Sequence, residues 1–146
     1  MDAGYSGTEL RRKLGAEPGM RVAAIGGPDD LPARLEGARV SRQLRGSFEL
    51  IVFFATSQRS LEVRLAAILR ARDAGGRVWI AWPKRSSGVH SDLDDDTVRR
   101  IGLASGLVDN KVCAIDDTWS ALRFVERRPS PAATRKRTGD AVYDSR

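Results

Sequence analysis

The chain has 146 residues, 41% hydrophobic and 30% charged, which is the composition of one soluble globular domain that needs no metal or disulfide. A single cysteine, Cys113, excludes an internal disulfide and favours a reducing, cytoplasmic location. The longest apolar run, Leu50–Ala55, is too short to span a bilayer, and the N-terminus lacks the order of a signal peptide, so no membrane association is predicted.

The net charge of +6 is concentrated near the C-terminus. Residues 127–146 hold six arginines and lysines against two aspartates, so the rest of the chain is close to neutral. This segment also has too few apolar residues to order itself. We therefore predict one domain over residues 1–127 and a basic, disordered tail over residues 128–146. The tail predicts no more than weak, salt-sensitive contact with nucleic acid.

Short elements are predicted in the first third of the chain. Thr8 is a good N-cap for a helix over Glu9–Leu14, and Gly15 is placed to be its left-handed stop. A strand over Met20–Ile25 then ends at Gly26-Gly27-Pro28. Next come a helix over Leu31–Glu36 and an arginine-rich edge strand over Arg39–Leu44.

The central third carries the most apolar segments. Phe48–Ala55 has the continuous apolar run of a strand buried on both faces, and an amphipathic helix follows it. Gly75-Gly76 is expected to end that helix and to begin a strand through Trp82, with Trp79 and Trp82 on opposite faces. The loop from Pro83 to Asp96 is the longest in the chain.

A helix and a hairpin complete the predicted fold. Asp94 or Asp95 can cap a helix over Thr97–Ser105. The last strands, Lys111–Ile115 and Ala121–Glu126, are joined by a short turn and are expected to pair antiparallel. This order predicts a three-layer α/β fold whose open, mostly parallel sheet closes with an antiparallel hairpin.

The predicted fold locates a candidate site. In open α/β sheets, ligands bind outside the carboxyl ends of the parallel strands. The residues that follow those ends, or lie in the hairpin turn, are the candidate ligand-binding residues: Gly26, Gly27, Thr56, Ser57, Trp82, Pro83, Lys84, Asp116 and Trp119. Lys84 could meet an anion at this edge, and Trp82 or Trp119 could stack on a planar ligand, although core packing also explains the tryptophans.

The entrance Leu14–Val22, the glycine pair Gly26-Gly27 and the closing hairpin resemble Rossmann-like, class I S-adenosylmethionine-dependent methyltransferases. That family places a G-x-G-x-G loop after its first strand and an acidic residue at the end of its second. Here Pro28 removes a donor from the loop, and the second strand ends in Gln43-Leu44-Arg45. The resemblance therefore implies the fold without the usual cofactor motif.

A second resemblance covers residues 5–127. The segments that carry it are Tyr5–Leu10, Lys13–Gly15, Trp82–Lys84, Ser87-Gly88, Gly102–Asp109, Lys111–Asp116 and Trp119-Ser120. On these, the chain resembles a family of small bacterial proteins of unknown function. This resemblance implies a Rossmann-like fold and brings no activity with it.

No catalytic arrangement is visible. The only histidine, His90, lies in the long loop beside serines that no G-x-S-x-G elbow accompanies. No Cys/His spacing predicts zinc, and Asp94-Asp95-Asp96 is explained as a helix cap. Cys113 sits in an apolar strand pattern, as an inert core thiol does. We therefore predict no catalytic and no metal-binding residues.

Three functions remain open. The main expectation is a non-catalytic or degenerate Rossmann-like module that binds a small ligand, with no cofactor and with a small anion as the expected partner. The first alternative is an S-adenosylmethionine-dependent methyltransferase with an atypical cofactor loop. The second is a nucleic-acid-associated protein that acts through its basic tail. The oligomeric state is left open.

Overall fold

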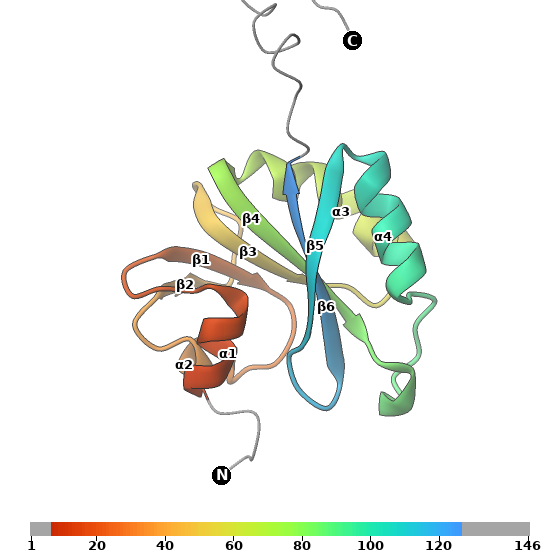
Figure 1. The fold of residues 1–146 in the computed structure, drawn as a ribbon, viewed down its shortest axis with the longest axis horizontal. Helices are drawn as coiled ribbons and strands as arrows, with labels where there is room; N and C mark the ends of the chain where they lie inside the picture. Colours follow the sequence, from red (N-terminus) through yellow and green to blue (C-terminus); the bar gives the residue numbers. More distant parts are fainter. Residues whose placement is uncertain (1–6, 127–146) are drawn as a thin grey trace, which may run out of the picture.

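The computed structural model describes residues 7–126, which form one six-stranded sheet with helices on both faces (Figure 1). Residues 1–6 of the predicted domain and the predicted tail lie outside the described residues. The strands are β1 (Arg21–Ile25), β2 (Arg39–Ser41), β3 (Phe48–Phe54), β4 (Arg72–Pro83), β5 (Leu107–Ala114) and β6 (Trp119–Glu126). The helices are α1 (Gly7–Leu14), α2 (Leu31–Arg34), α3 (Gln58–Arg70) and α4 (Asp95–Ala104), with a 3-10 turn η1 (Arg85–Ser87).

The strand order is β2-β1-β3-β4-β6-β5. The first four of these pair in parallel, whereas β6 runs antiparallel to both β4 and β5. The predicted fold class is therefore confirmed, including the antiparallel hairpin at the end of the chain. Parallel strands need crossovers, and here α2 and α3 provide them on opposite faces.

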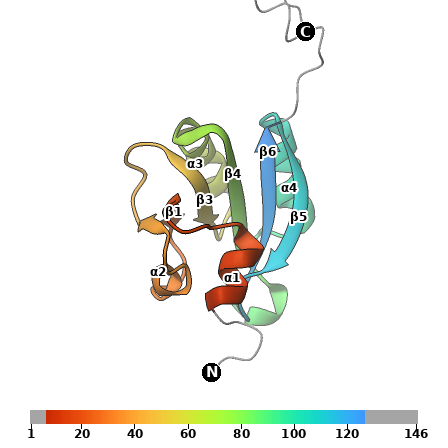
Figure 2. The same cartoon turned by 60° about the vertical axis from the view of Figure 1, so that its left-hand side comes forward.

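Two apolar clusters separate the layers. The first joins α3 and α4 to one face of the sheet and includes Phe53, Trp82 and Phe124. The second joins α1 and α2 to the other face and includes Leu14 and Trp79. Figure 2 shows α1 in front of the sheet, with α4 behind β5 and β6. The two tryptophans of β4 thus point to opposite faces, as predicted.

Several boundaries differ from those predicted. Helix α3 stops at Arg70, before the glycine pair, and β4 begins at once with Arg72. Phe48 pairs with Arg72 and Leu50 with Arg77, so β4 bulges between these points. Gly75 and Gly76 lie in this bulge, and a Cβ on Gly76 would meet backbone oxygens at 2.9 and 3.1 Å. The glycines therefore serve strand pairing and do not end the helix.

Two of the predicted caps are present, whereas Thr8, predicted as an N-cap, lies inside α1 because that helix begins at Gly7. Gly15 adopts φ +80° at the end of α1, and the Asp94 carboxylate accepts a hydrogen bond from the Thr97 amide at 2.9 Å. That bond, the largest cause, holds the pKa of Asp94 below its ordinary value. No helix within residues 7–126 is long and apolar enough to cross a bilayer.

Candidate functional site

The carboxyl ends of β1, β3 and β4 meet at one edge of the sheet, because these strands are parallel. Strand β6 starts at the same edge, where Trp119 lies opposite Pro83. The structure therefore places the nine candidate residues along this edge, although not all on the same face. Their role in ligand binding stays a prediction.

The turn after β1 depends on two glycines, Gly26 and Gly27, and is called the glycine turn below. Gly26 and Gly27 have φ of +79° and +80°, a conformation that other residues rarely adopt. A Cβ on Gly27 would lie 2.5 Å from the Phe54 ring, so only glycine fits there. The amide groups of Gly26 and Gly27 donate no hydrogen bond within the described residues. Two backbone donors are therefore available to a ligand at this edge.

The end of β2 carries a cation next to the glycine turn. Arg42 follows the strand directly, and its Nη2 donates a hydrogen bond to the Gly26 carbonyl oxygen at 3.1 Å. No carboxylate occupies the end of this strand, as the sequence indicates. Arg42 was not among the candidate residues, because its contact with Gly26 depends on the pairing of β1 with β2.

An aromatic pair connects the glycine turn to the hairpin. The rings of Phe54 and Trp119 are 5.0 Å apart and close to perpendicular, which is a favourable aromatic geometry. Phe54 is buried and was missed as a site residue because it reads as ordinary strand core. The Asp116 carboxylate accepts hydrogen bonds from the amides of Thr118 and Trp119, and so shapes the turn that positions Trp119.

The end of β3 supplies a free hydroxyl. Thr56 is exposed, and its side chain makes no hydrogen bond to the described residues. The Ser57 hydroxyl instead caps α3, accepting a bond from the Ser60 amide at 3.0 Å. Next to it, the Gln58 amide donates to the Asp92 carboxylate at 2.8 Å, which ties the start of α3 to the long loop.

That loop encloses a cavity of about 370 Å³ at the exit of β4. Its lining is mostly polar: Pro83, Lys84, Arg85, Val89, Ser91, Asp92, Leu93 and Asp94. The backbone of Lys84 is held in place, because its amide donates a hydrogen bond to the Thr118 carbonyl oxygen at 2.7 Å. Trp82, by contrast, is only 6% exposed and packs in the α3–α4 cluster, facing away from the glycine turn.

The geometry of the described residues does not favour a histidine-based, metal-binding or thiol-based site. His90 is exposed in the loop. Residues 7–126 contain no group of three His, Cys, Asp or Glu side chains that could hold a metal ion. Burial raises the pKa of Cys113 to about 11, which keeps the thiol protonated and unreactive near neutral pH.

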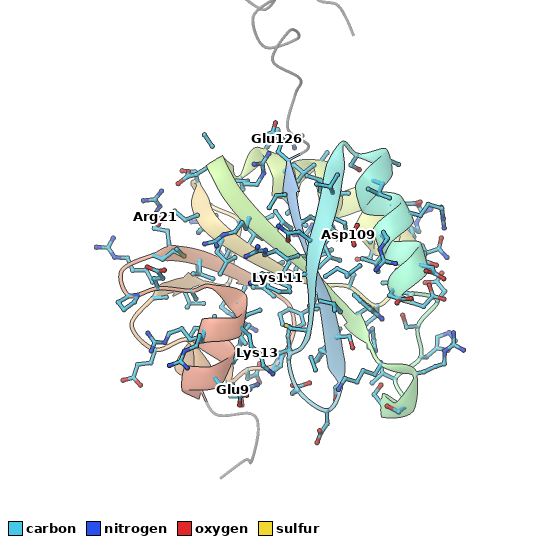
Figure 3. All side chains as sticks on the ribbon, in the orientation of Figure 1. Glu9, Lys13, Arg21, Asp109, Lys111 and Glu126 are labelled. Carbon is cyan, nitrogen blue, oxygen red and sulfur yellow. The ribbon has the colours of Figure 1, made fainter. Side chains whose placement is uncertain are left out.

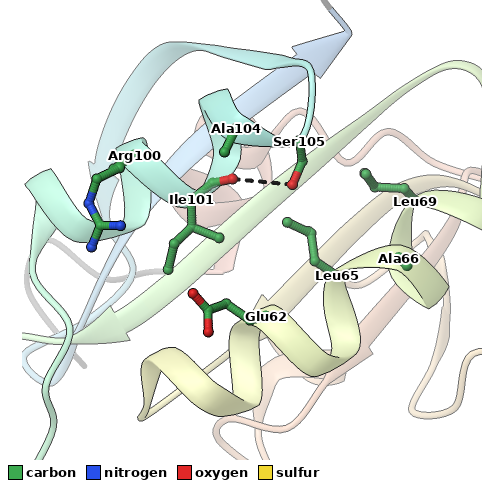
Figure 4. Close-up of a pocket in the computed structure, with 8 residues that line it drawn as sticks. All are labelled: Glu62, Leu65, Ala66, Leu69, Arg100, Ile101, Ala104 and Ser105. Carbon is green, nitrogen blue, oxygen red and sulfur yellow. Dashed lines mark hydrogen bonds between the residues drawn. The ribbon is translucent and has the colours of Figure 1, made fainter.

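A second cavity, of about 420 Å³, lies between α3 and α4 (Figure 4). Its walls are mainly apolar, with Glu62 and Arg100 at the sides. The Ser105 hydroxyl inside it already donates to the Ile101 carbonyl oxygen at 3.2 Å. None of the candidate residues lines this cavity.

The fold was compared with known proteins. No family model matches the sequence, and no curated protein matches it either. Solved structures do match. A SAM-dependent methyltransferase from Aquifex aeolicus has a TM-score of 0.58 at 11% identity, covering 82% of this chain and 89% of that one.

Two other matches contain a bound ligand. Magnesium protoporphyrin IX methyltransferase from Synechocystis, with S-adenosylhomocysteine bound, has a TM-score of 0.54 at 8% identity, covering 82% of this chain and 79% of that one. The 1,6-didemethyltoxoflavin-N1-methyltransferase from Burkholderia thailandensis, with 1,6-didemethyltoxoflavin and S-adenosylhomocysteine bound, has a TM-score of 0.57 at 10% identity, covering 86% of this chain and 80% of that one. The chain thus has the Rossmann-like methyltransferase fold.

These matches correct two expectations. A non-catalytic binding module and the absence of a cofactor were expected from the missing motif, but the matched proteins are methyltransferases, several with S-adenosylmethionine or its product bound. Both expectations are wrong on this evidence. The error has a physical source, since the sequence argument counted the donor that Pro28 lacks, whereas the amides of Gly26 and Gly27 donate no hydrogen bond within the described residues. The resemblance to a family of unknown function finds no support here.

Proposed function

We propose that this chain binds S-adenosylmethionine at the Gly26–Gly27 turn and is a methyltransferase with an atypical cofactor loop. The observation that carries the proposal is the pair of unpartnered amides in a left-handed turn at the carboxyl end of β1. Backbone amides at this position of an open α/β sheet are well placed to hold a cofactor. The fold shared with methyltransferases supports the same reading.

Each group at the edge has a proposed task. Bound S-adenosylmethionine would supply an electrophilic methyl group. Gly26 and Gly27 would hold it by their amides, and the Thr56 hydroxyl would donate or accept one further bond. The buried Phe54, packed on Trp119, would exclude water from one side. The end of β2 would contribute no carboxylate to the ribose, which is what makes the site atypical.

The methyl acceptor is proposed to occupy the cavity at the exit of β4. It lies on the same edge, and the Gln58–Asp92 bond joins its loop to the end of β3. Lys84 suits an acceptor that carries an anionic group, the small anionic partner predicted from the sequence. The proposed setting is the cytoplasm, which the single cysteine supports.

Isothermal titration calorimetry of the full chain with S-adenosylmethionine and S-adenosylhomocysteine tests the proposal. Wild-type protein is expected to bind both ligands, whereas Gly26→Ala, which places a Cβ at φ +79°, is expected to bind at least about tenfold more weakly. Gly19→Ala is the matched control, because Gly19 has φ +81° and nothing within 4 Å of a new Cβ. It carries the same backbone strain but lies away from the edge.

Two results would overturn the proposal. One is no detectable heat for either ligand with wild-type protein. The other is equal weakening by Gly26→Ala and Gly19→Ala, which would mean that backbone strain alone reduces binding. Thr56→Val is expected to weaken binding by less than Gly26→Ala, because it removes a single hydrogen-bonding group.

A further inference from the structure

The sheet face that carries α1 holds a row of cations on three neighbouring strands, β4, β6 and β5. Lys111 of β5 lies directly opposite Arg123 of β6. Arg123 in turn lies opposite Trp79, and Arg77 is two residues from Trp79 on the same face of β4. Since neighbouring strands are about 4.8 Å apart, Lys111 and Arg123 lie side by side, and Arg77 lies diagonally from Arg123, two residues along β4 from the directly opposite position. We call this group the cation row.

Helix α1 adds a fourth charge to the row. The Arg77 guanidinium lies against the end of α1, where its Nη2 donates to the Gly15 carbonyl oxygen at 3.4 Å. Lys13, in the last turn of α1, is close enough to Cys113 of β5 to affect its pKa. Figure 3 shows Lys13 and Lys111 on the side of the sheet that carries α1.

None of these four cations forms an ion pair with a described carboxylate. Arg123 bonds instead to the neutral Asn110 side chain at 2.9 Å. The pKa of Arg123 is lowered by burial first and then by the positive charge of Arg77. Some arginines elsewhere do form ion pairs, as in Arg21–Asp73, Arg72–Glu126, Arg85–Asp94 and Arg99–Asp109. The cation row instead gathers four positive charges that no described carboxylate neutralises by an ion pair.

Like charges directly opposite each other across strands destabilise a sheet. A bound polyanion would relieve this repulsion. We propose that the cation row binds nucleic acid through its phosphate backbone. Guanidinium groups match phosphate oxygens in a bidentate geometry. The row crosses three strands on a sheet face, which suits an extended strand better than a single small anion.

The proposed contact would not depend on the nucleotide sequence. Arg77, Arg123, Lys111 and Lys13 can neutralise phosphates, whereas Trp79, the aromatic side chain that lies opposite Arg123, is fully buried and cannot stack on bases. It also differs from the tail contact predicted from the sequence, because it uses side chains fixed on the folded domain. It goes beyond the proposed methyl transfer and does not depend on it.

Fluorescence anisotropy with a labelled 20-nucleotide oligouridine tests this inference, using the full chain at several potassium chloride concentrations. The double variant Lys111→Gln/Arg123→Gln is expected to bind at least about tenfold more weakly, and to lower the log–log salt slope by about 1.4, since each single-strand phosphate contact contributes about 0.7. A DNA oligomer of the same length is expected to behave alike. Lys111→Arg is expected to keep wild-type affinity.

The matched control is Arg59→Gln/Arg70→Gln on α3, which removes the same charge from the opposite layer. It is expected to leave affinity and salt slope within about twofold of wild type. Equal weakening by the two double variants would overturn the proposal, because total charge would then explain binding. No binding by wild-type protein, or tighter binding to polyglutamate than to oligouridine, would overturn it as well.

Discussion

The two layers that cover the sheet are unequal. On one side, α3 and α4 supply 13 and 10 residues, and their cluster contains Phe53, Trp82 and Phe124. On the other, α1 and α2 supply 8 and 4 residues. The glycine turn packs on Phe54 of this thinner layer, and the cation row lies on the same side of the sheet. The comparison teaches that the glycine turn and the cation row lie over the thinner layer, whereas the cavity at the exit of β4 borders Leu93 of the thicker one.

The largest expected effect tests the thicker layer. Phe124 is fully buried and packs directly against Gly102 of α4. Phe124→Ala is expected to lower the free energy of unfolding by about 3–5 kcal/mol, because it removes apolar contacts and leaves a cavity. Urea denaturation measures this. Val112→Ala, on the neighbouring strand at a side chain that is 67% exposed, serves as the control and should change little.

The second prediction concerns the attachment of α1. The Trp79 indole donates a buried hydrogen bond to the Leu14 carbonyl oxygen at 3.0 Å. Trp79→Phe is expected to lower the free energy of unfolding by about 1–3 kcal/mol, because that carbonyl loses its hydrogen-bond donor. Hydrogen exchange should show the loss of protection concentrated in α1, with α3 and α4 little changed. An equal loss across both layers would contradict the division between them.

The third prediction concerns pH and the start of α4. The Thr97 hydrogen bond lowers the pKa of Asp94 below the ordinary value of 3.8. Because the pKa is lowered in the folded state, the charged Asp94 carboxylate stabilises the fold above pH 3.8. That stabilisation is lost as the pH falls through the folded pKa. Asp94→Asn keeps a capping side chain but cannot titrate. The variant should therefore show a smaller fall in melting temperature than wild type as the pH is lowered from about 5 through the folded pKa of Asp94.

The smallest expected effect belongs to the cation row. Lys111→Gln removes one of two like charges that face each other on β5 and β6. It is expected to raise the free energy of unfolding by about 0.2–1 kcal/mol. Thermal melting at low salt measures the gain, and Lys111→Arg should show none. A loss of stability in Lys111→Gln would mean that the lysine stem stabilises the face by packing.

The predictable features of this fold are the local ones. Gly15 was identified as a helix end, and Asp94 or Asp95 as a helix start, because capping depends on neighbours within one turn. The apolar run at β3 likewise marks a strand buried on both faces. The bulge at Gly75 and Gly76 was missed, because it depends on pairing with Phe48, far away in the chain.

In the candidate site, too, some features could be predicted from the sequence and others could not. Topology was enough to predict that residues such as Thr56 and Lys84 would follow strands ending at one edge. The contacts of Phe54 with Gly27 and of Arg42 with Gly26 were not predictable, since each joins separate strands by side-chain packing. Gly26 and Gly27 were among the candidate residues, but the sequence could not show that their amides donate no hydrogen bond within the described residues, because this depends on the course of the chain after β1.

The contact between Phe54 and Trp119 has a practical consequence. Trp79 and Trp82 are buried in the two clusters, whereas Trp119 is only partly buried at the carboxyl edge. Its indole touches the ring that packs on Gly27. Of the three indoles, Trp119 is thus the one whose emission should respond when a molecule settles on the glycine turn. The protein carries its own optical reporter, and a titration would need no label.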